Sequence, residues 1–352
     1  MDIIYQNKEL SKNIIRLDKK YSDLDNLIPN DVVDIYDFID CIDIQYINHG
    51  ECGIIFLCRP SNTSEIYVMK YCPDHGNNYG NNDDIMKPNN VEIIIMNLLF
   101  TNFEDSDKIY FIKPIMSFQV DMLESIELLF KFIPKQVKQK YNDMFNYKPN
   151  TNASIIIMEY CEDGTIYEWL LENHDTISTR EWSTILFHIL YTLAIIQQKY
   201  PSFRHNDLRL QNVLIKSYDS DITHTINGYK FSPYNIGVIP KICDFDWCTI
   251  LDLVDNNKIP DDSDNMYHIS SQENKYYDMH YFINIFVFMV KSAGIHVPKE
   301  IIQFAKRVIP KKYKIIYDRQ EKNYQRIDVD EFTTPLNVIC NDPLFENIRT
   351  IC

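Results

Sequence analysis

Short apolar stretches separated by polar turns dominate the first half of the chain. The segments FIDCIDIQYI, GIIFLCR and EIYVMKY, all within residues 38–71, predict antiparallel strands. IKPIMSF (112–118) and SIIIMEY (154–160) predict two more strands. VEIIIMNLLF (91–100) contains no turn residue and predicts a helix packed against the sheet. The first half is therefore expected to be a five-stranded antiparallel sheet with one helix.

The pattern becomes helical after Gly164. Apolar residues recur at helical spacing in TREWSTILFHILYTLAIIQQKY (179–200). YYDMHYFINIFVFMV (276–290) is apolar on nearly all sides, which predicts a buried helix. A sheet-rich half followed by a helical half predicts an α+β protein of two lobes with a cleft between them.

The same pattern suggests how the chain is organised. Residues 1–38 are charged and predict a helical extension, residues 39–160 the first lobe, and residues 161–352 the second. Two polar or charged segments, 119–153 and 217–237, are interpreted as insertions, one in each lobe. The Asn-, Gly- and Pro-rich stretch 72–90 predicts a surface loop.

Composition narrows the possible partners and the cellular compartment. The formal charge of −15 argues against nucleic-acid binding and docking on anionic membranes, and favours basic partners. Nine cysteines without a C-x-x-C pair indicate free thiols in a reducing compartment. The N-terminus lacks a signal-peptide core, and no apolar run approaches the roughly 20 residues that span a bilayer. A soluble, cytoplasmic protein is expected.

The string HNDLRLQNVLI (205–215) carries the strongest chemical signal. It places Asp207 five residues before Asn212, directly ahead of a short apolar strand. An Asp in this pattern can accept the proton of an attacking hydroxyl, and the Asn oxygen can ligate a metal that bridges phosphates. Either residue alone would more often make a turn. The complete string predicts a phosphoryl-transfer loop.

A second carboxylate follows in KICDFDWC. Asp244 comes directly after the apolar segment 238–243 and is expected to be the principal metal ligand, with Phe245 packed beside the 91–100 helix. The D-F-D string alone is weak evidence for a metal ligand, and its position after residues 205–215 strengthens that evidence.

The first lobe offers a clamp for the nucleotide. INHGECGIIF (47–56) places Gly50 and Gly53 where backbone N–H groups can approach phosphates. Two glycines at this spacing more often form only a hairpin turn. Lys70 follows 17 residues after Gly53, at the end of a strand, and Glu92 is the acidic residue of the 91–100 helix. A strand lysine is usually solvated, whereas here it is expected to pair with Glu92 and contact phosphates.

IIIMEYCEDGT (155–165) is expected to connect the lobes. Backbone groups near Glu159 and Cys161 are expected to bond the adenine edge, with Met158 behind the base. Asp278 lies inside an apolar helix, where a carboxylate must be satisfied, and is expected to accept backbone N–H bonds from the 205–215 loop.

These segments together resemble the eukaryotic-type protein kinase superfamily over roughly residues 40–345. HNDLRLQNVLI, D-F-D in place of D-F-G, and YYDMHYF resemble the serine/threonine kinases of large cytoplasmic DNA viruses, among them the poxvirus virion kinase and giant-virus kinases. TTPLNVICNDPLFENI (333–348) resembles the closing helix of such domains. The resemblance implies a two-lobed kinase-like fold with a shortened C-lobe, and virion association if the source is viral.

The resemblance also implies a reaction and a set of site residues. The γ-phosphate of ATP would pass to a protein Ser or Thr hydroxyl with Mg²⁺, or Mn²⁺ in its place. The implied phosphate loop comprises Asn48, Gly50, Gly53 and Ile55, and the implied phosphate contact and its ion-pair partner are Lys70 and Glu92. The implied adenine pocket comprises Met158, Glu159 and Cys161. The implied catalytic base is Asp207, the γ-phosphate contact is Arg209, and the metal ligands are Asn212 and Asp244.

Several positions depart from the family pattern. Asn48 replaces the first glycine, Arg209 replaces a lysine and Asp246 replaces a glycine. Asn206 stands where an Arg would receive an activation-loop phosphate, so activity without such phosphorylation is expected. No Ala-Pro-Glu occurs in 249–275, which leaves the substrate-docking floor undefined.

Two alternatives to an active protein kinase stay open. A pseudokinase scaffold would keep the fold, although such proteins usually lose one of the five residues Lys70, Glu92, Asp207, Asn212 and Asp244. A small-molecule phosphotransferase of the same fold shares the 205–212 pattern, and the Gly50/Gly53 loop and M-E-Y-C hinge favour protein substrates. An acidic run suggests basic substrates or else a solvated face: Asp252, Asp255, Asp261, Asp262 and Asp264.

Overall fold

The computed structural model describes residues 13–29, 31–50, 53–61, 63–73, 84–144, 151–259, 268–314, 317–318, 323–324 and 326–352. Within them the chain divides into two compact units. Unit 1 comprises residues 1–104, 112–160 and 256–258, and unit 2 comprises residues 105–111, 161–255 and 259–352. The predicted loop positions 74–83 and the acidic positions 261, 262 and 264 lie outside the described residues.

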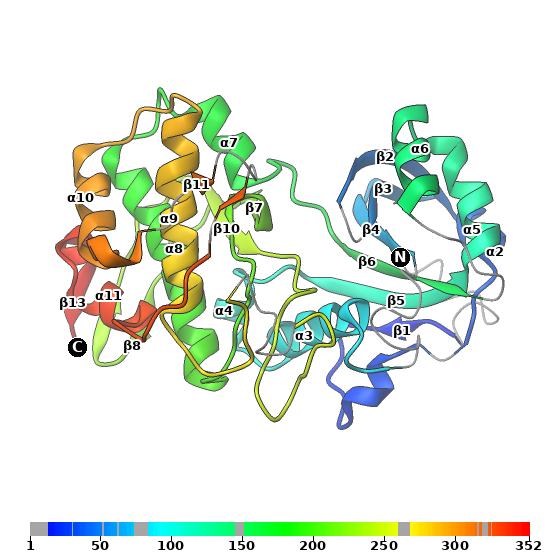
Figure 1. Ribbon diagram of the computed structural model, residues 1–352, viewed down its shortest axis with the longest axis horizontal. Coiled ribbons are helices and arrows are strands. Elements are labelled where there is room, and N and C mark those ends of the chain that lie inside the picture. The colour runs from blue at the N-terminus through cyan, green and yellow to red at the C-terminus, as the bar shows by residue number, and fades with distance from the viewer. Residues whose placement is uncertain are drawn as a thin grey trace. The chain divides into compact units, whose positions relative to one another are not determined.

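Unit 1 is built on a six-stranded sheet with the order β1-β5-β6-β4-β3-β2 (Figure 1). Its strands are β1 (Ile15–Arg16), β2 (Ile42–His49), β3 (Ile54–Pro60), β4 (Tyr67–Cys72), β5 (Pro114–Asp121) and β6 (Asn152–Glu159). All neighbouring strands pair antiparallel. The five strands predicted from the sequence are present, and β1 adds a sixth at the edge beside β5.

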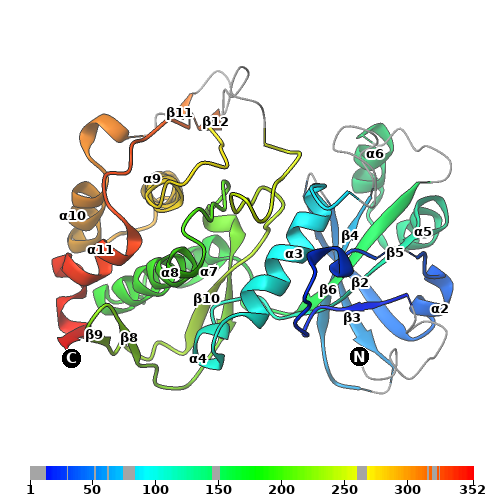
Figure 2. The ribbon, with the colours of Figure 1, turned by 90° about the horizontal axis from the view of Figure 1, so that it is seen from below.

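Helices cover both faces of this sheet (Figure 2). They are α2 (Ile35–Ile39), α3 (Pro88–Thr101), α5 (Met122–Leu129) and α6 (Lys135–Met144), with 3-10 turns η2 (Leu24–Leu27) and η3 (Phe130–Phe132). On one face, residues of α2, α5 and α6 form a common apolar core with strand residues such as Phe56, Met69 and Phe118. α3 lies on the other face (Figure 2). β4 is therefore buried on both sides, with Met69 and Tyr71 toward the core cluster and Lys70 toward α3.

Two expectations for unit 1 need correction. The helical extension predicted for residues 1–38 is wrong for the part that the structure describes, because residues 13–34 hold only β1 and η2, and α2 begins at Ile35. The backbone N–H of Leu17 bonds to Ile115 at 2.9 Å, so this segment joins the sheet. The insertion predicted for residues 119–153 is also shorter than expected, because β5 extends to Asp121 and β6 begins at Asn152. Between them lie α5, η3 and α6, so the sheet carries more than the one helix expected.

Unit 2 is mainly helical. Its helices are α4 (Asp105–Lys108), α7 (Ile166–Asn173), α8 (Thr179–Lys199), α9 (Tyr277–Ser292), α10 (Lys299–Val308) and α11 (Pro335–Asn341), with 3-10 turns η4 (Leu210–Asn212), η6 (Lys311–Tyr313) and η7 (Pro343–Ile348). Capping boxes start α7 at Thr165 and α8 at Ser178, which fixes where both helices begin. α8 is buried from Trp182 to Gln197 without interruption, and the Trp182 and Phe286 rings join it to α9 at 5.7 Å.

Short ladders complete unit 2. β7 (Val213–Ser217) pairs with β10 (Val238–Ile242), and β11 (Tyr317–Asp318) with β12 (Asn323–Tyr324). The predicted 217–237 insertion contains the hairpin of β8 (His224–Ile226) and β9 (Tyr229–Phe231), which β13 (Arg349–Ile351) extends to three strands. The C-terminal segment thus packs on the insertion, which is more ordered than its polar, turn-rich sequence suggests. Among the helices of the described residues, none is long and apolar enough to cross a membrane.

Candidate active site

Lys70 and Glu92 form a buried ion pair in unit 1. Lys70 Nζ donates to Glu92 Oε1 at 2.8 Å and to Oε2 at 2.7 Å, and the two side chains are 9% and 3% exposed. β4 carries Lys70 on the face covered by α3, and α3 presents Glu92 in its second turn. α3 begins at Pro88, earlier than the sequence pattern indicated, because proline is well tolerated in the first turn of a helix. The pairing predicted from the sequence is confirmed.

The two glycines predicted to lie at phosphates flank the β2–β3 turn. The N–H of Gly50 donates to the Gly53 carbonyl at 2.9 Å. A Cβ on Gly53 would lie 2.7 Å from the Tyr71 carbonyl oxygen, whereas one on Gly50 would meet no atom within 4 Å. Asn48 is exposed at a register shift in this hairpin, and Ile55 lies opposite Lys70 in the ladder. Gly53 is thus required by packing, whereas a side chain at Gly50 would not meet this barrier.

The residues expected at the adenine lie where β6 ends. Met158 is buried, with 7% of its surface exposed, opposite Val68 of β4. The Glu159 N–H donates to the Lys113 carbonyl at 3.0 Å, and its side chain accepts the Lys113 N–H at 2.7 Å. Cys161 is buried and belongs to unit 2. Glu159 therefore fixes the end of the strand through both its backbone and its carboxylate.

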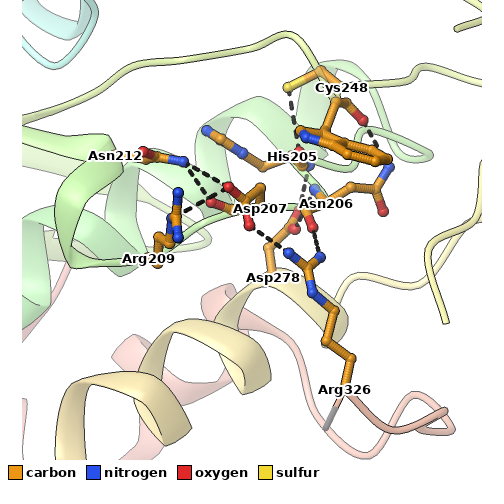
Figure 3. A network of polar contacts seen from close by, with 9 residues as sticks. His205, Asn206, Asp207, Arg209, Asn212, Cys248, Asp278 and Arg326 are labelled. Carbon is orange, nitrogen blue, oxygen red and sulfur yellow. Dashed lines mark hydrogen bonds and ion pairs between the residues drawn. The ribbon is translucent and has the colours of Figure 1, made fainter. Parts of the chain in front are cut away.

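Asp207, Asn212 and Arg209 meet in unit 2 (Figure 3). Asn212 Nδ2 donates to the Asp207 carbonyl at 2.9 Å and to Asp207 Oδ2 at 3.0 Å. Arg209 Nε lies 3.3 Å from the same Oδ2 and is half exposed. The amide oxygen of Asn212 points away from Asp207 (Figure 3). The carboxylate is thus oriented by its own loop, and the Asn212 oxygen is directed elsewhere.

α9 supports this loop from below. Asp278 Oδ2 accepts the N–H of His205 at 2.7 Å, and Oδ1 accepts that of Asn206 at 2.9 Å, as predicted for this carboxylate. Asn206 adopts a left-handed backbone with φ of 62°, which Asn tolerates better than most residues. Its Nδ2 donates to the Trp247 carbonyl at 3.0 Å, which ties the loop to the segment after Asp244.

The β7–β10 ladder brings Asn212 and Asp244 to one end. Ile242 pairs with Val213, and the Cys243 N–H donates to the Asn212 carbonyl at 3.0 Å. Asp244 follows with a φ of 66°, another left-handed residue. Phe245 is buried, and its ring lies 5.3 Å from that of His205. The sequence predicts that Phe245 packs against α3, and because α3 belongs to unit 1 this contact stays a prediction.

Arg326 also reaches Asp207, and nothing in the sequence predicted it. Its Nη2 donates to Asp207 Oδ1 and its Nη1 to the Asn206 carbonyl. Burial by itself would lower the pKa of Arg326, but the neighbouring Tyr281 and Asp207 raise the pKa above that of a free guanidinium. An isolated arginine in an irregular segment has no periodicity or motif, and 119 residues separate it from Asp207. Only the three-dimensional fold reveals this contact.

Comparison with known proteins finds one relative that is similar over most of this chain. The profile of the family described as protein tyrosine and serine/threonine kinase matches residues 112–265. A protein of Acanthamoeba polyphaga mimivirus named as a serine/threonine-protein kinase is 31% identical over 331 residues, which cover 88% of this chain and 70% of that relative. The chain belongs to the protein kinase family.

Further relatives agree with this assignment. A second mimivirus protein named as a serine/threonine-protein kinase is 40% identical over 83 residues, 22% of this kinase and 21% of that relative. A serine/threonine-protein kinase of Schizosaccharomyces pombe is 25% identical over 109 residues, 31% of this kinase and 25% of that relative. The predicted α+β kinase fold and the resemblance to kinases of large DNA viruses are confirmed.

Proposed function

We propose that this kinase transfers the γ-phosphate of ATP to Ser or Thr hydroxyls of a protein substrate. The observation that carries the proposal is the Asp207 carboxylate, held by Asn212 and Arg209 in the loop whose sequence resembles the kinase catalytic loop. The relatives named as serine/threonine-protein kinases favour these hydroxyls over tyrosine.

Asp207 is the proposed general base. A carboxylate within hydrogen-bond reach of the substrate hydroxyl can accept its proton as the oxygen attacks phosphorus. Asn212 and Arg209 prevent the carboxylate from turning away, so little reorganisation is needed during the reaction. Arg209 is half exposed and is also proposed to contact the γ-phosphate, where its planar guanidinium would form a different geometry from a lysine.

Asp244 and Asn212 are the proposed ligands of Mg²⁺, with Mn²⁺ as the alternative ion. The residues fit such an ion, because Mg²⁺ prefers oxygen ligands and usually keeps only one or two carboxylates beside substrate phosphates. The Asn212 oxygen points away from Asp207, and the ladder brings Asp244 to the same end. Among the described residues no cluster of three or more His, Cys, Asp or Glu side chains forms a metal site, which agrees with ligation shared with a nucleotide. When bound, the ion neutralises charge on the phosphates.

In unit 1, Lys70 is the proposed contact of the α- and β-phosphates. The buried Glu92 carboxylate pairs with the Lys70 ammonium and fixes its direction. Asn48, Gly50, Gly53 and Ile55 are proposed to cover the phosphates, and the backbone near Glu159 and Cys161, with Met158, to hold adenine. The first lobe is proposed to begin after residue 38 and to end at residue 160, as the sequence predicts.

Activity is proposed not to require phosphorylation of the activation segment. In kinases with Arg at the position of Asn206, that Arg receives the phosphate. Here the Asn206 amide bonds directly to the Trp247 carbonyl. A hydrogen bond that needs no phosphate thus connects the catalytic loop to the segment after Asp244. Basic protein substrates are proposed from the charge of −15 and from Asp252 and Asp255, which are exposed in this segment.

The test is transfer of label from γ-labelled ATP to histone or protamine, followed by phosphoamino-acid analysis. We expect labelled Ser or Thr with Mg²⁺, no transfer after chelation, and unchanged activity after phosphatase treatment of the kinase. ATP binding without transfer to any acceptor would instead indicate a pseudokinase. Transfer to an aminoglycoside or choline in preference to protein would indicate a small-molecule phosphotransferase.

A further inference from the structure

Arg326 contacts the catalytic loop, although it lies outside every segment that the sequence predicted to form the active site. We propose that Arg326 is a positioning residue, which holds the Asp207 carboxylate and the Asn206 backbone in the geometry required for phosphoryl transfer. The inference rests on the proposed function, because it gives Arg326 a role in the reaction in which Asp207 is the base.

The contact is made by both terminal nitrogens of one guanidinium (Figure 3). Nη1 donates to the carbonyl oxygen of Asn206, and Nη2 donates to Oδ1 of Asp207. The planar fork of an arginine fixes the relative position of two acceptors, whereas a lysine presents a single point charge. Arg326 therefore links the side chain of Asp207 to the backbone of the residue before it.

The guanidinium occupies a built site. The Arg326 side chain is only 12% exposed, and its guanidinium lies 4.2 Å over the ring of Tyr281. Such cation–π contacts are stronger when they are shielded from water. Tyr281 belongs to α9, which also carries Asp278, the residue that accepts the N–H groups of His205 and Asn206. One helix thus supports the loop directly through Asp278 and indirectly through Arg326.

The segment that follows Arg326 is anchored to the start of α9. The Val329 carbonyl accepts from Asn274 Nδ2 at 2.6 Å, and Glu331 accepts the Lys275 N–H at 2.9 Å. The Phe332 ring contacts that of Tyr276 at 5.8 Å. The residues after Arg326 are consequently anchored to unit 2 itself, which favours a lasting part of the site over an inhibitory arm that leaves when substrate binds.

The bonds to Asp207 leave room for a substrate hydroxyl. An ionised carboxylate offers about four acceptor positions. Asn212 and Arg209 use those of Oδ2, and Arg326 uses one on Oδ1. Counting the contacts of the described residues, one position on Oδ1 remains for the hydroxyl whose proton Asp207 would take. The geometry thus favours support of the base over its obstruction.

The asparagine at position 206 gives a reason for the Arg326 guanidinium to lie beside this loop. Its backbone is left-handed, with φ of 62°, and it stands where other kinases carry an arginine in the loop. Arg326 brings a guanidinium to this loop from 120 residues further along and binds the Asn206 carbonyl itself.

The test compares Arg326→Met and Arg326→Lys with the wild type in labelled-phosphate transfer. Loss of a charge-assisted hydrogen bond should lower kcat of Arg326→Met by about 10- to 100-fold, with KM and Kd for ATP unchanged. Arg326→Lys, which keeps the charge, should recover part of that loss. Arg307→Met is the matched control, because Arg307 forms a similar fork to Asp342 at 2.8 and 2.6 Å in an exposed position. Its activity should equal that of the wild type.

Each outcome decides one question. If Arg326→Met transfers phosphate as fast as the wild type, or faster, Arg326 does not support the base and the inference is overturned. If Arg326→Met shows no cooperative thermal transition, Arg326→Lys decides, and a wild-type kcat in that variant overturns the inference. A wild type without any transfer would refute the proposed function instead. A loss of ATP affinity equal to the loss of kcat would indicate a merely structural role and would also overturn the inference.

Discussion

At the scale of single residues, the kinase uses buried charged side chains to orient other side chains. Lys70 and Glu92 are almost fully buried, and burying an ion pair is seldom a net gain in stability. Removing one partner is strongly destabilising, because the other charge stays buried without compensation. The pair is therefore better explained by what Lys70 is proposed to hold than by stability of the fold.

Glu92→Gln tests this explanation. The amide keeps the size of the side chain but leaves the Lys70 ammonium without an anion. We expect kcat to fall by about 100-fold, which corresponds to roughly 2.7 kcal/mol of transition-state stabilisation, while ATP still binds. Steady-state kinetics with ATP titration measures both quantities.

Asp105→Asn is the control for Glu92→Gln. Asp105 pairs with Lys108 at the similar distance of 2.8 Å, but its side chain is 96% exposed. Exposed pairs contribute little, so wild-type kcat is expected. Equal kcat in both variants would show that the buried pair has no part in turnover.

At the scale of elements, strand pairing decides which chemical groups meet. The β7–β10 ladder joins Asn212 to the residue before Asp244, and the β2–β3 hairpin carries both glycines. In that hairpin the two glycines differ, because only Gly53 has a backbone carbonyl against it, that of Tyr71 on β4. Gly53 thus allows the start of β3 to approach β4 closely, and Gly50 stays a predicted phosphate contact.

Gly53→Ala and Gly50→Ala should separate these two roles. A methyl group 2.7 Å from the Tyr71 oxygen cannot be accommodated without a backbone shift, so Gly53→Ala should lower the free energy of unfolding by about 1–3 kcal/mol. Gly50→Ala should leave it unchanged and raise KM for ATP if this loop covers phosphates. Urea denaturation and ATP kinetics are the measurements. Equal destabilisation by both would contradict the packing difference.

Local patterns predicted the main elements and some of the contacts at the site, among them the Lys70–Glu92 pair and the bonds of Asp278 to the loop. Five strands, the long helices and the 205–215 loop follow from short segments whose periodicity or motif is complete in itself. β1 is only two residues long and exists because it pairs with Ser117 and Met116, so no local pattern could indicate it. Arg326 was missed for the same reason, since its partners are set by tertiary packing alone.

At the scale of the whole molecule, unit 2 encloses a polar cluster that the sequence did not indicate. The Tyr110 hydroxyl bonds to His188 Nδ1 at 2.8 Å and to His224 Nε2 at 2.6 Å. A hydroxyl has one proton, so one neutral ring must accept and the other must donate. Burial lowers the pKa of His188 to about 3 and that of His224 to about 4. The cluster joins residue 110, α8 and the 217–237 insertion through groups that must stay uncharged.

Acid should therefore destabilise the kinase. The unfolded chain binds protons near pH 6.5, whereas the native rings stay neutral until about pH 4, so stability is complete above pH 6.5 and falls as pH drops toward 4. At pH 5 each of these two rings should lower the free energy of unfolding by about 2 kcal/mol. Urea denaturation at pH 7.5 and 5 measures the difference.

His188→Gln should reduce this pH dependence, and the exposed His296→Gln should not. His280 adds to the remaining slope, since burial lowers its pKa to about 4 as well. A wild-type stability that is constant from pH 7.5 to pH 5 would contradict the neutral state of the cluster.

Asp207 is the proposed base on which phosphoryl transfer depends, and Asp207→Asn tests that role most directly. The amide preserves the size of the side chain but cannot take the proton of a hydroxyl. With γ-labelled ATP and a basic protein acceptor, we predict ordinary ATP affinity and a rate of Ser or Thr phosphorylation lowered by at least about 100-fold. Phosphorylation by Asp207→Asn at a rate near that of the wild type would contradict the assignment.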